Sequence, residues 1–367
     1  MLIYFSIAVA LFAGAVAVAP HVLPWPVMVS LNGMSVQIPR GTTVERAAMN
    51  NMSHTQLRGD LLAVDGTMLS EGGGGHPTFT IRGQEVDPNT PLRRSQSIVV
   101  TRGVDQQEAS IEQEFEIEPE QNSRGRGSMK TVTDSGQVGT SLRTLGKESE
   151  IELKVEVLTE PQTVEVQLSS YQGADQLIAL TFDDGPHPEH TPALLDVLAR
   201  EGVSATFFVT GLEVTRFPDI ARRIVEEGHQ IANHSYTHRD YRDMSYVDKR
   251  IDFQRAQDAI EEATGVRPNW ARPPYGLMNA STLSLFGKED IRVVLWTIDP
   301  LDFRRPGAGA IRNHVVDRAR PGSIVLLHDG GGNREQTIRA TRNIIRDLRE
   351  EGFEFLTVEQ LYRRAND

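Results

Sequence analysis

The sequence predicts an α/β protein in which small β-rich modules precede a parallel barrel. After Gln176 the chain alternates short apolar strands with amphipathic helices, a pattern that builds a parallel sheet. Before that point, strand-like stretches follow one another without long helices, and an apolar run lies at the N-terminus. A chain of 367 residues is long enough for all of these parts.

Residues 2–19 form an unbroken run of apolar or small residues, and no charged residue precedes Arg40. A run of this length is near the minimum for a membrane-spanning helix and is also compatible with a secretory signal. Either interpretation exports the rest of the chain. We assign residues 1–26 to a signal peptide or signal anchor and favour the uncleaved anchor, which attaches the protein to the membrane through an N-terminal apolar helix.

Residues 27–103 contain short strands separated by turn residues, with one short helix among them. This order predicts a small β-grasp-like module. The four consecutive glycines at 72–75 predict a flexible hairpin tip, since no Lys-Ser/Thr ending of a phosphate loop follows them.

Residues 104–172 show a period of two. Phe115 and Ile117 alternate with glutamates, and a second alternating stretch covers residues 151–168, which predicts half-buried antiparallel strands with the glutamates on a solvated face. The glycines between these stretches give the segment a loose resemblance to the G-five-type modules of bacterial surface proteins. That resemblance implies a spacer or wall-binding role.

Residues 173–367 carry the repeated strand and helix units. Thr191-Pro192 predicts the start of one helix, and Ser245 with Asp248 predicts a capping box at the start of another. Such units close most economically into a barrel. About 190 residues are too few for eight units, so we predict a deformed (β/α)7 barrel.

The composition excludes several classes of site and partner. A formal net charge of −12 argues against a nucleic-acid partner, because binding a phosphate backbone requires clustered Lys and Arg. The chain has no cysteine, which rules out disulfides and thiolate metal sites and leaves His and carboxylate as the strong metal ligands. We expect a monomer.

Polar side chains stand directly after several predicted strands of the barrel. The loops at the carboxyl ends of barrel strands converge on one mouth, so residues that are distant in sequence become neighbours there. The sequence therefore predicts a single site, formed by Asp183, Asp184, His234, His238, Asp299 and His328.

His234 and His238 are four residues apart, a spacing that puts both imidazoles on one face of a helical turn. Two such histidines alone are typical of an exposed surface. One aspartate added to them makes a three-ligand set that leaves a position open for water, as a catalytic zinc or related ion requires. Adjacent side chains of an extended chain point in opposite directions, so one of Asp183 and Asp184 should bind metal while the other faces the water.

Five short motifs in this region resemble those of the NodB-homology polysaccharide deacetylases, carbohydrate esterase family 4, in their order and spacing. They are TFDDGP (181–186), HSYTH (234–238), RPPYG (272–276), DPLDF (299–303) and LLH (326–328). The resemblance covers about 190 residues and implies a deformed (β/α)7 barrel. It also implies metal-dependent removal of N-acetyl groups from the amino sugars of an extracytoplasmic polysaccharide in the bacterial cell envelope, either peptidoglycan or N-acetylglucosamine oligomers.

The resemblance assigns a role to each motif residue. Asp184, His234 and His238 become the ligands of a divalent metal, with Zn²⁺ as the first choice and Co²⁺ or Mn²⁺ as alternatives. Asp183 becomes the general base, paired with Arg272.

On the other side of the implied reaction, His328 becomes the general acid, held by Asp299. The backbone N–H of Tyr275 helps to stabilise the oxyanion. The substrate-binding residues implied are Pro273, Tyr275, Phe303 and Leu326. Outside the resemblance, Asp302 and Asn333 are further candidates for contacts to the substrate or to the site.

The sequence departs from the family at Phe303, where Trp is usual, so the indole N–H is missing while the apolar wall is kept. Tyr275 favours N-acetylglucosamine, because some relatives that act on muramic-acid units carry a basic residue there. Two alternatives remain open: an O-acetyl esterase acting on a xylan-like polymer, and a catalytically inactive wall-binding protein.

Overall fold

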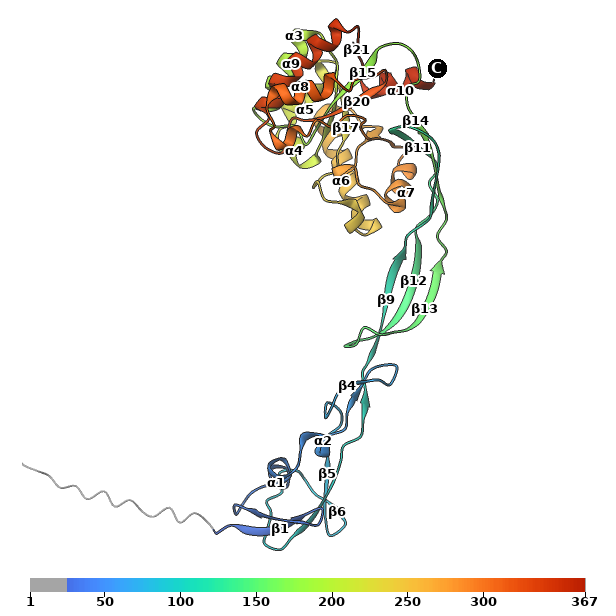
Figure 1. The fold of residues 1–367 in the computed structure, drawn as a ribbon. Helices are drawn as coiled ribbons and strands as arrows, with labels where there is room; N and C mark the ends of the chain where they lie inside the picture. The colour runs from blue at the N-terminus through green and yellow to red at the C-terminus, as the bar shows by residue number, and fades with distance from the viewer. Residues whose placement is uncertain (1–24, 367) are drawn as a thin grey trace, which may run out of the picture. The chain divides into compact units, whose positions relative to one another are not determined.

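The computed structural model describes residues 25–366 and divides into two compact units (Figure 1). Unit 1 runs to Gln113 and includes Thr144–Lys154; unit 2 comprises Glu114–Arg143 and the chain from Val155 onward. The predicted N-terminal anchor lies outside the described residues except for its last two positions. None of the described helices is long and apolar enough to cross a membrane.

Unit 1 contains a five-stranded sheet with the order β2-β1-β7-β5-β6 and a small sheet with the order β4-β3-β8. One face of the larger sheet packs with helix α1 into a core that includes Val44, Phe79 and Ile98. The elements are β1 (Val27–Leu31), β2 (Met34–Ile38), α1 (Val44–Asn51), α2 (His54–Leu57), β3 (Leu61–Leu62), β4 (Met68–Ser70), β5 (Thr78–Ile81), β6 (Gln84–Glu85), β7 (Ser97–Thr101) and β8 (Gln106–Gln107).

The glycines at 72–75 do not form a free hairpin tip, contrary to the prediction. Gly74 N donates to Gly59 O at 2.8 Å, and Gly75 N donates to Val104 O at 2.9 Å. A Cβ added to Gly74 would lie 2.3 Å from the carbonyl oxygen of Asp60, so the chain at this point is held against neighbouring backbone that leaves no room for a side chain.

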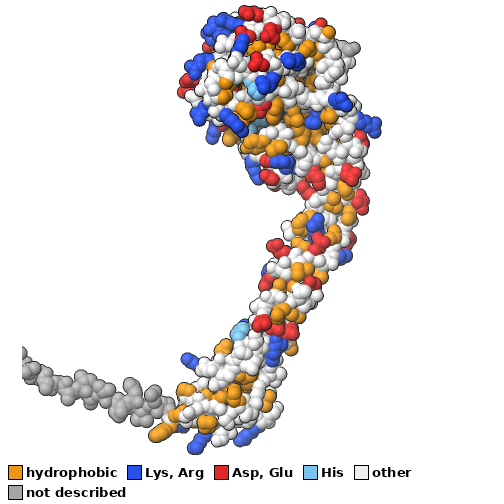
Figure 2. All heavy atoms as spheres, viewed as in Figure 1, with side chains coloured by type: hydrophobic (Ala, Val, Ile, Leu, Met, Phe, Trp, Pro, Cys, Tyr) orange, Lys and Arg blue, Asp and Glu red, His pale blue; other side chains and the backbone are white. Residues whose placement is uncertain are grey.

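The boundary between the units falls within β9 (Ser110–Ile117), β12 (Gly139–Gly146) and β13 (Glu152–Thr159), which form a sheet in the order β13-β12-β9. Figure 2 shows hydrophobic and acidic side chains mixed along this part of the chain. The alternation predicted around Phe115 is present, because its side chain is half-buried while the flanking glutamates are exposed.

The sheet of unit 2 contains, among the described residues, seven strands that pair only in parallel with one another. The order β19-β18-β17-β16-β15-β20 is continuous, and β21 adds to β15. Every residue of β15 is buried, as expected for a strand covered on both faces. The strands are β15 (Leu177–Asp183), β16 (Thr206–Val209), β17 (Gln230–Asn233), β18 (Trp270–Ala271), β19 (Arg292–Val294), β20 (Ser323–His328) and β21 (Glu354–Phe355).

The chain beyond β19 brings the two ends of this sheet together. Ile298 forms a parallel bridge with Val325, and Leu326 N donates to Ile298 O at 2.9 Å. The ring is therefore closed by a short contact, which is a distorted form of barrel closure.

Three strands that precede the barrel in sequence extend the same sheet. β11 (Met129–Asp134) pairs antiparallel with β19, and β14 (Val164–Ser169) lies between β11 and β10 (Gln121–Gly125). The segment predicted as a separate module at 104–172 is thus divided in the structure. Most of it belongs to the unit that contains the barrel, because β19 would otherwise present an unpaired edge.

Helices cover the outside of the barrel, where α3 and α8 each pack against α9 (Figure 1). Ser245 caps α6, as predicted, whereas the helix predicted to start at Thr191 begins one residue earlier. The helical elements are α3 (His190–Glu201), α4 (Gly211–Arg216), α5 (Pro218–Glu226), η1 (Tyr241–Asp243), α6 (Tyr246–Thr264), η2 (Pro274–Gly276), α7 (Ala280–Lys288), η3 (Asp302–Arg304), α8 (Ala308–Val316), α9 (Glu335–Glu350) and α10 (Val358–Asn366).

Candidate active site

The carboxyl ends of neighbouring barrel strands bring the predicted polar residues to one mouth. Asp183 ends β15 and lies in register with His328, which ends β20. His234 follows β17 and Arg272 follows β18, two strands that pair at Asn233 and Ala271. The strand register therefore explains why four segments that are far apart in sequence meet here.

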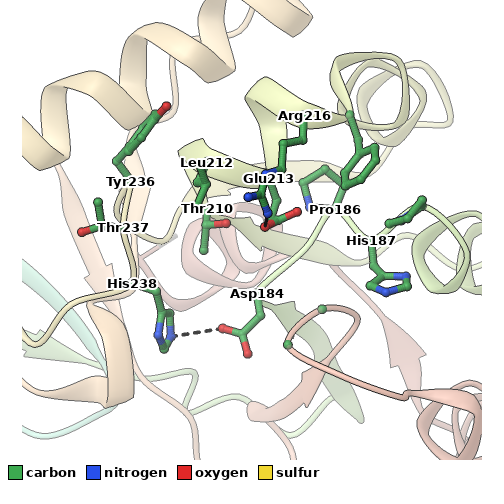
Figure 3. Close-up of a pocket in the computed structure, with 14 residues that line it drawn as sticks. Asp184, Pro186, His187, Thr210, Leu212, Glu213, Arg216, Tyr236, Thr237 and His238 are labelled. Carbon is green, nitrogen blue, oxygen red and sulfur yellow. Dashed lines mark hydrogen bonds and ion pairs between the residues drawn. The ribbon is translucent and has the colours of Figure 1, made fainter.

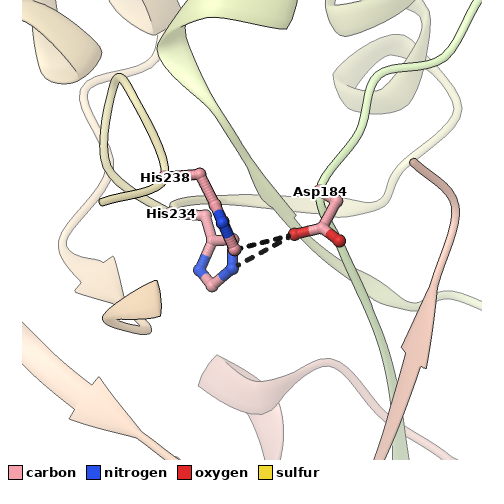
Figure 4. Close-up of side chains that lie close together, drawn as sticks. All are labelled: Asp184, His234 and His238. Atoms are coloured by element: carbon pink, nitrogen blue, oxygen red, sulfur yellow. Dashed lines mark ion pairs between the residues drawn. The ribbon is translucent and has the colours of Figure 1, made fainter. Parts of the chain in front are cut away.

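Asp184, His234 and His238 point toward one another (Figure 4). Asp184 Oδ1 lies 3.1 Å from His238 Nε2 and 3.5 Å from His234 Nε2. One ligand atom from each residue lies within 4.8 Å of the others, a spacing that could hold a metal ion. These are the three residues that the family resemblance assigned as ligands.

The donor set fits a cation. His234 Nδ1 lies 2.6 Å from the carbonyl oxygen of Arg272, to which it donates its proton, so Nε2 of the neutral ring carries a lone pair. That lone pair faces Asp184 Oδ1, which is buried and accepts no hydrogen bond from residues 25–366. Buried lone pairs that face one another repel unless a positive charge lies between them.

The pKa shifts point to the same negative environment. Burial raises the pKa of Asp184, but the adjacent imidazoles of His234 and His238 outweigh it and hold that pKa far below its usual range. Burial lowers the pKa of His234, whereas the charges of Asp183 and Asp184 raise it, with a net rise. Two carboxylates thus attract a cation to the imidazole, either a proton or a metal.

Asp252 of α6 holds the turn that carries the two histidines. Its carboxylate accepts hydrogen bonds from Tyr236 N at 2.8 Å, Thr237 N at 3.1 Å and Thr237 Oγ1 at 2.5 Å. The turn includes left-handed residues, with φ of 69° at Ser235 and 57° at His238. The sequence analysis missed Asp252, because it lies inside an ordinary helix and no local pattern marks it.

Arg272 pairs with Asp183, as the resemblance implied. Its Nη1 lies 2.7 Å from Asp183 Oδ1 and 2.8 Å from Thr181 Oγ1, and the guanidinium lies over the ring of Phe208 at 4.1 Å. Burial lowers the pKa of Arg272 and Asp183 opposes this shift, but a guanidinium starts so high that it stays charged. The carboxylate of Asp183 is therefore held in a fixed position beside the ligands.

Asp302 holds His328, which corrects the prediction that Asp299 does so. Asp302 Oδ1 lies 2.6 Å from His328 Nδ1, and Oδ2 accepts hydrogen bonds from His328 N and Thr337 Oγ1. Asp299 instead accepts from Leu301 N at 2.8 Å, which turns the chain so that Asp302 faces the histidine. Burial lowers the pKa of His328, but the bond and charge of Asp302 produce a net rise.

The remaining predicted residues surround the same mouth. The ring of Tyr275 stands edge-on to His238 with centroids 4.7 Å apart, and the ring of Phe303 stands edge-on to His328 at 5.9 Å. Tyr275 and Phe303 are exposed, whereas Pro273 and Leu326 are buried.

Asp329 is a buried carboxyl group that the sequence analysis did not single out. It follows His328 and accepts a hydrogen bond from Thr191 Oγ1 at 2.5 Å. Burial raises the pKa of Asp329 to about 7, against the hydrogen bond from Thr191 and with the charges of Asp184 and Asp183 adding to the rise. A Cβ on Gly185 would lie 2.2 Å from its carboxylate, so Asp329 packs directly against the segment after Asp184.

A groove of about 520 Å³ opens from the ligands (Figure 3). Asp184 and His238 lie in its wall together with Tyr236, Leu212, Glu213 and Arg216. Arg216 Nη1 and Glu213 Oε1 form an ion pair at 2.8 Å, so the charges on this side of the mouth offset each other. The groove gives a chain-like substrate room beside the ligands.

Residues 170–294 match the polysaccharide deacetylase family. A peptidoglycan-N-acetylglucosamine deacetylase from Bacillus cereus is 38% identical over 196 residues, which are 52% of this chain and 89% of the relative. A chitooligosaccharide deacetylase from Bradyrhizobium sp. is 40% identical over 197 residues, 50% of this chain and 90% of the relative.

Two solved structures resemble unit 2. The Bc1960 peptidoglycan N-acetylglucosamine deacetylase aligns with a TM-score of 0.51 at 34% identity, covering 53% of this chain and 91% of that one. A family pseudoenzyme from Bacillus anthracis, BA3943, aligns with a TM-score of 0.50 at 27% identity, covering 53% and 68%.

Proposed function

The chain belongs to the polysaccharide deacetylase family, carbohydrate esterase family 4, whose members are hydrolases, and from this premise we propose that it removes N-acetyl groups from an amino-sugar polysaccharide with the help of a bound divalent metal. The proposed substrate contains N-acetylglucosamine and is peptidoglycan or a related oligomer. The observation that carries the proposal is the meeting of a metal-ligand set, a fixed carboxylate and a carboxylate-paired histidine at one mouth.

We assign Asp184, His234 and His238 as the ligands and Zn²⁺ as the ion, with Co²⁺ or Mn²⁺ as alternatives. A divalent ion at this position supplies polarisation of the acetyl carbonyl and acidification of a water molecule. All further steps fall to groups of the chain itself.

Asp183 acts as the general base. It accepts the proton of the attacking water, and Arg272 holds its carboxylate in place through the 2.7 Å contact.

His328 acts as the general acid. It gives a proton from Nε2 to the nitrogen of the leaving amine, because Nδ1 is occupied by Asp302. The charge of Asp302 favours the imidazolium that this step consumes. The backbone N–H of Tyr275 stabilises the oxyanion, and Pro273, Phe303 and Leu326 line the space for the acetyl group and the sugar.

We further propose that the enzyme acts outside the cytoplasm in a bacterial envelope, either secreted or held by the apolar segment at 1–26. The β-grasp-like module (27–103) and the strands that follow it (104–172) would then hold the barrel (173–367) at the wall or bind the wall themselves. The proposed oligomeric state is a monomer.

The test is acetate release by the full chain from three substrates: soluble peptidoglycan fragments, chitohexaose and acetylated xylan. We expect acetate from the first two, loss of activity after chelation, and recovery with added Zn²⁺. Preferential hydrolysis of xylan would replace the proposal with an O-acetyl esterase. Absence of acetate from all three substrates with metal-loaded protein would support an inactive wall-binding protein. This outcome is worth testing because one of the similar solved structures is a pseudoenzyme.

A further inference from the structure

Two arginines without an acidic partner follow the residue that holds the proposed acid. Arg304 and Arg305 come directly after Asp302 and Phe303, and both side chains are exposed. Over residues 25–366, no ion pair involves either guanidinium. Many other exposed arginines of unit 2 are paired, including Arg216 with Glu213 in the groove on the other side of the ligands.

The backbone that carries these arginines, and the guanidinium of Arg304, are placed relative to His328. Phe303 stands edge-on to His328 with centroids 5.9 Å apart, and the guanidinium of Arg304 lies over the Phe303 ring at 5.6 Å. Arg305 N donates to Asp302 O at 2.9 Å, and its φ of 55° ends the short helix η3 at this point. Asp302 therefore contacts His328 through its carboxylate and the segment that carries both arginines through its backbone carbonyl.

Unpaired guanidinium groups at the rim of a site attract anions. Arginine presents its donors in a planar fork that matches a carboxylate, and a rim charge mainly affects the capture and positioning of a charged ligand. The two aspartates of the mouth are already engaged, Asp183 by Arg272 and Asp184 by the histidines. Arg304 and Arg305 have no acidic partner among the described residues, so their charges are available to an anionic group of the substrate.

We propose that Arg304 and Arg305 bind carboxylate groups carried by the substrate polymer beside the sugar that loses its acetyl group. This inference rests on the proposed function and narrows its substrate class to peptidoglycan, whose peptide side chains bear carboxylates at regular intervals. Chitooligosaccharides are uncharged and would gain nothing from the two arginines.

The experiment compares wild type with R304Q/R305Q in the metal-loaded full chain. The substrates are soluble peptidoglycan fragments, the same fragments after conversion of their carboxyl groups to methylamides, and chitohexaose. For the untreated fragments we expect KM to rise about tenfold in the variant with kcat little changed. For the two uncharged substrates we expect a change of less than about twofold, and in wild type the preference for untreated fragments should weaken as salt screens the contact.

R200Q/R318Q is the matched control, because it removes two exposed positive charges at the end of the barrel opposite the mouth: Arg200 lies in the last turn of α3, and Arg318 follows the carboxyl end of α8. It should leave all three KM values unchanged. Equal effects of R304Q/R305Q on charged and uncharged substrates, or no effect on either, would overturn the inference while leaving the proposed deacetylation intact. Loss of acetate release from every substrate by wild type would instead count against the proposed function.

Discussion

The ligand side and the acid side of the mouth each hold a histidine through its Nδ1 atom, but the two histidines have different roles. His234 and His328 each have Nδ1 at 2.6 Å from an oxygen. The partner of His234 is the uncharged carbonyl of Arg272, whereas the partner of His328 is the carboxylate of Asp302. The carbonyl orients a neutral ring that offers a lone pair, and the carboxylate favours a protonated ring that offers a proton.

This difference teaches that the partner of Nδ1, more than the burial of the ring, sorts the histidines into ligand and acid. Both rings are largely buried, and for both of them burial alone would lower the pKa. The predictions below separate the two sides, beginning with the largest expected effect.

The ligand side should fail completely when one ligand is removed. D184A or H234A should lower acetate release by at least about 10³-fold and abolish metal retention, because the remaining two ligands cannot hold the ion. Metal content after dialysis and acetate release are the two measurements. H314A, a histidine of α8, is the control, and retention of one metal per chain in D184A would contradict the assignment.

The acid side should lose activity without losing metal. H328A should lower kcat by about 10²–10⁴-fold, the usual contribution of a positioned acid. Metal content should equal that of wild type, since His328 is not among the ligands. Loss of metal from H328A would show that His328 also helps to hold the metal, which would contradict its assignment as the acid alone.

The partner of the acid can be tested by pH. The charge of Asp302 contributes to raising the pKa of His328, so D302N should lower that pKa and lose the proton donor at a lower pH. The alkaline limb of the kcat profile should therefore move toward acid, with a rate loss of the order of 10²-fold. D299N should leave the limb in place, since within residues 25–366 the Asp299 carboxylate bonds to Leu301 N and not to His328. A shift in D299N would instead support the role predicted from the sequence.

The support of the ligand turn should affect metal affinity and little else. In D252A the backbone of Tyr236 and Thr237 loses its acceptor, and we expect the metal Kd to rise about 10–100-fold. At saturating metal, kcat should recover most of its wild-type value. E262A on the same helix is the control. An unchanged metal Kd in D252A would show that the turn carrying the histidines keeps its conformation without Asp252.

The smallest effect on activity is expected at Asp329, where stability is the readout. Its pKa of about 7 exceeds the ordinary value of about 3.9, so the folded chain keeps a proton that the unfolded chain releases. The stability contributed by this group is complete below about pH 4 and is lost as pH rises through 7, a change of about 1–4 kcal/mol. D329N should flatten this slope.

Urea unfolding of the metal-free full chain between pH 5 and pH 8, followed by the fluorescence of Trp270 and Trp296, measures the effect of D329N. Both tryptophans belong to unit 2. T264A, on a helix away from the mouth, serves as a comparison that keeps the wild-type slope. Parallel pH profiles for D329N and wild type would mean that Asp329 is ionised in the folded chain.

The gathering of Asp183, Asp184 and the histidines at one mouth was predictable because it depends on order along the chain. The choice of Asp184 as the ligand and the pairing of Asp183 with Arg272 came from the family resemblance. Polar residues that directly follow parallel strands must share an edge of the sheet, whatever the loops between them do. That argument needs no knowledge of side-chain direction beyond the alternation that separates Asp183 from Asp184.

The choice between Asp299 and Asp302 was not predictable in the same way. Both lie within a few residues of one strand end, and the outcome depends on the left-handed turn at Leu301, with φ of 54°. The sequence carries no glycine there to mark the turn. The glutamates of β9 show a similar limit: they are exposed, as predicted, but Glu116 also accepts from Tyr246 N at 2.8 Å, a contact that no local pattern reveals.

The pairing of β11 with β19 constrains how the chain can reach its native state. β11 is synthesised long before its partner β19, which ends at Val294. The edge of β11 that pairs with β19 therefore stays unpaired while the first four barrel strands are made. Contacts of such long sequence separation form slowly, because a large loop must close first. Folding of unit 2 should therefore be completed only after β19 has been synthesised. Until then the unpaired edge of β11 is exposed and can pair with another chain, which favours aggregation.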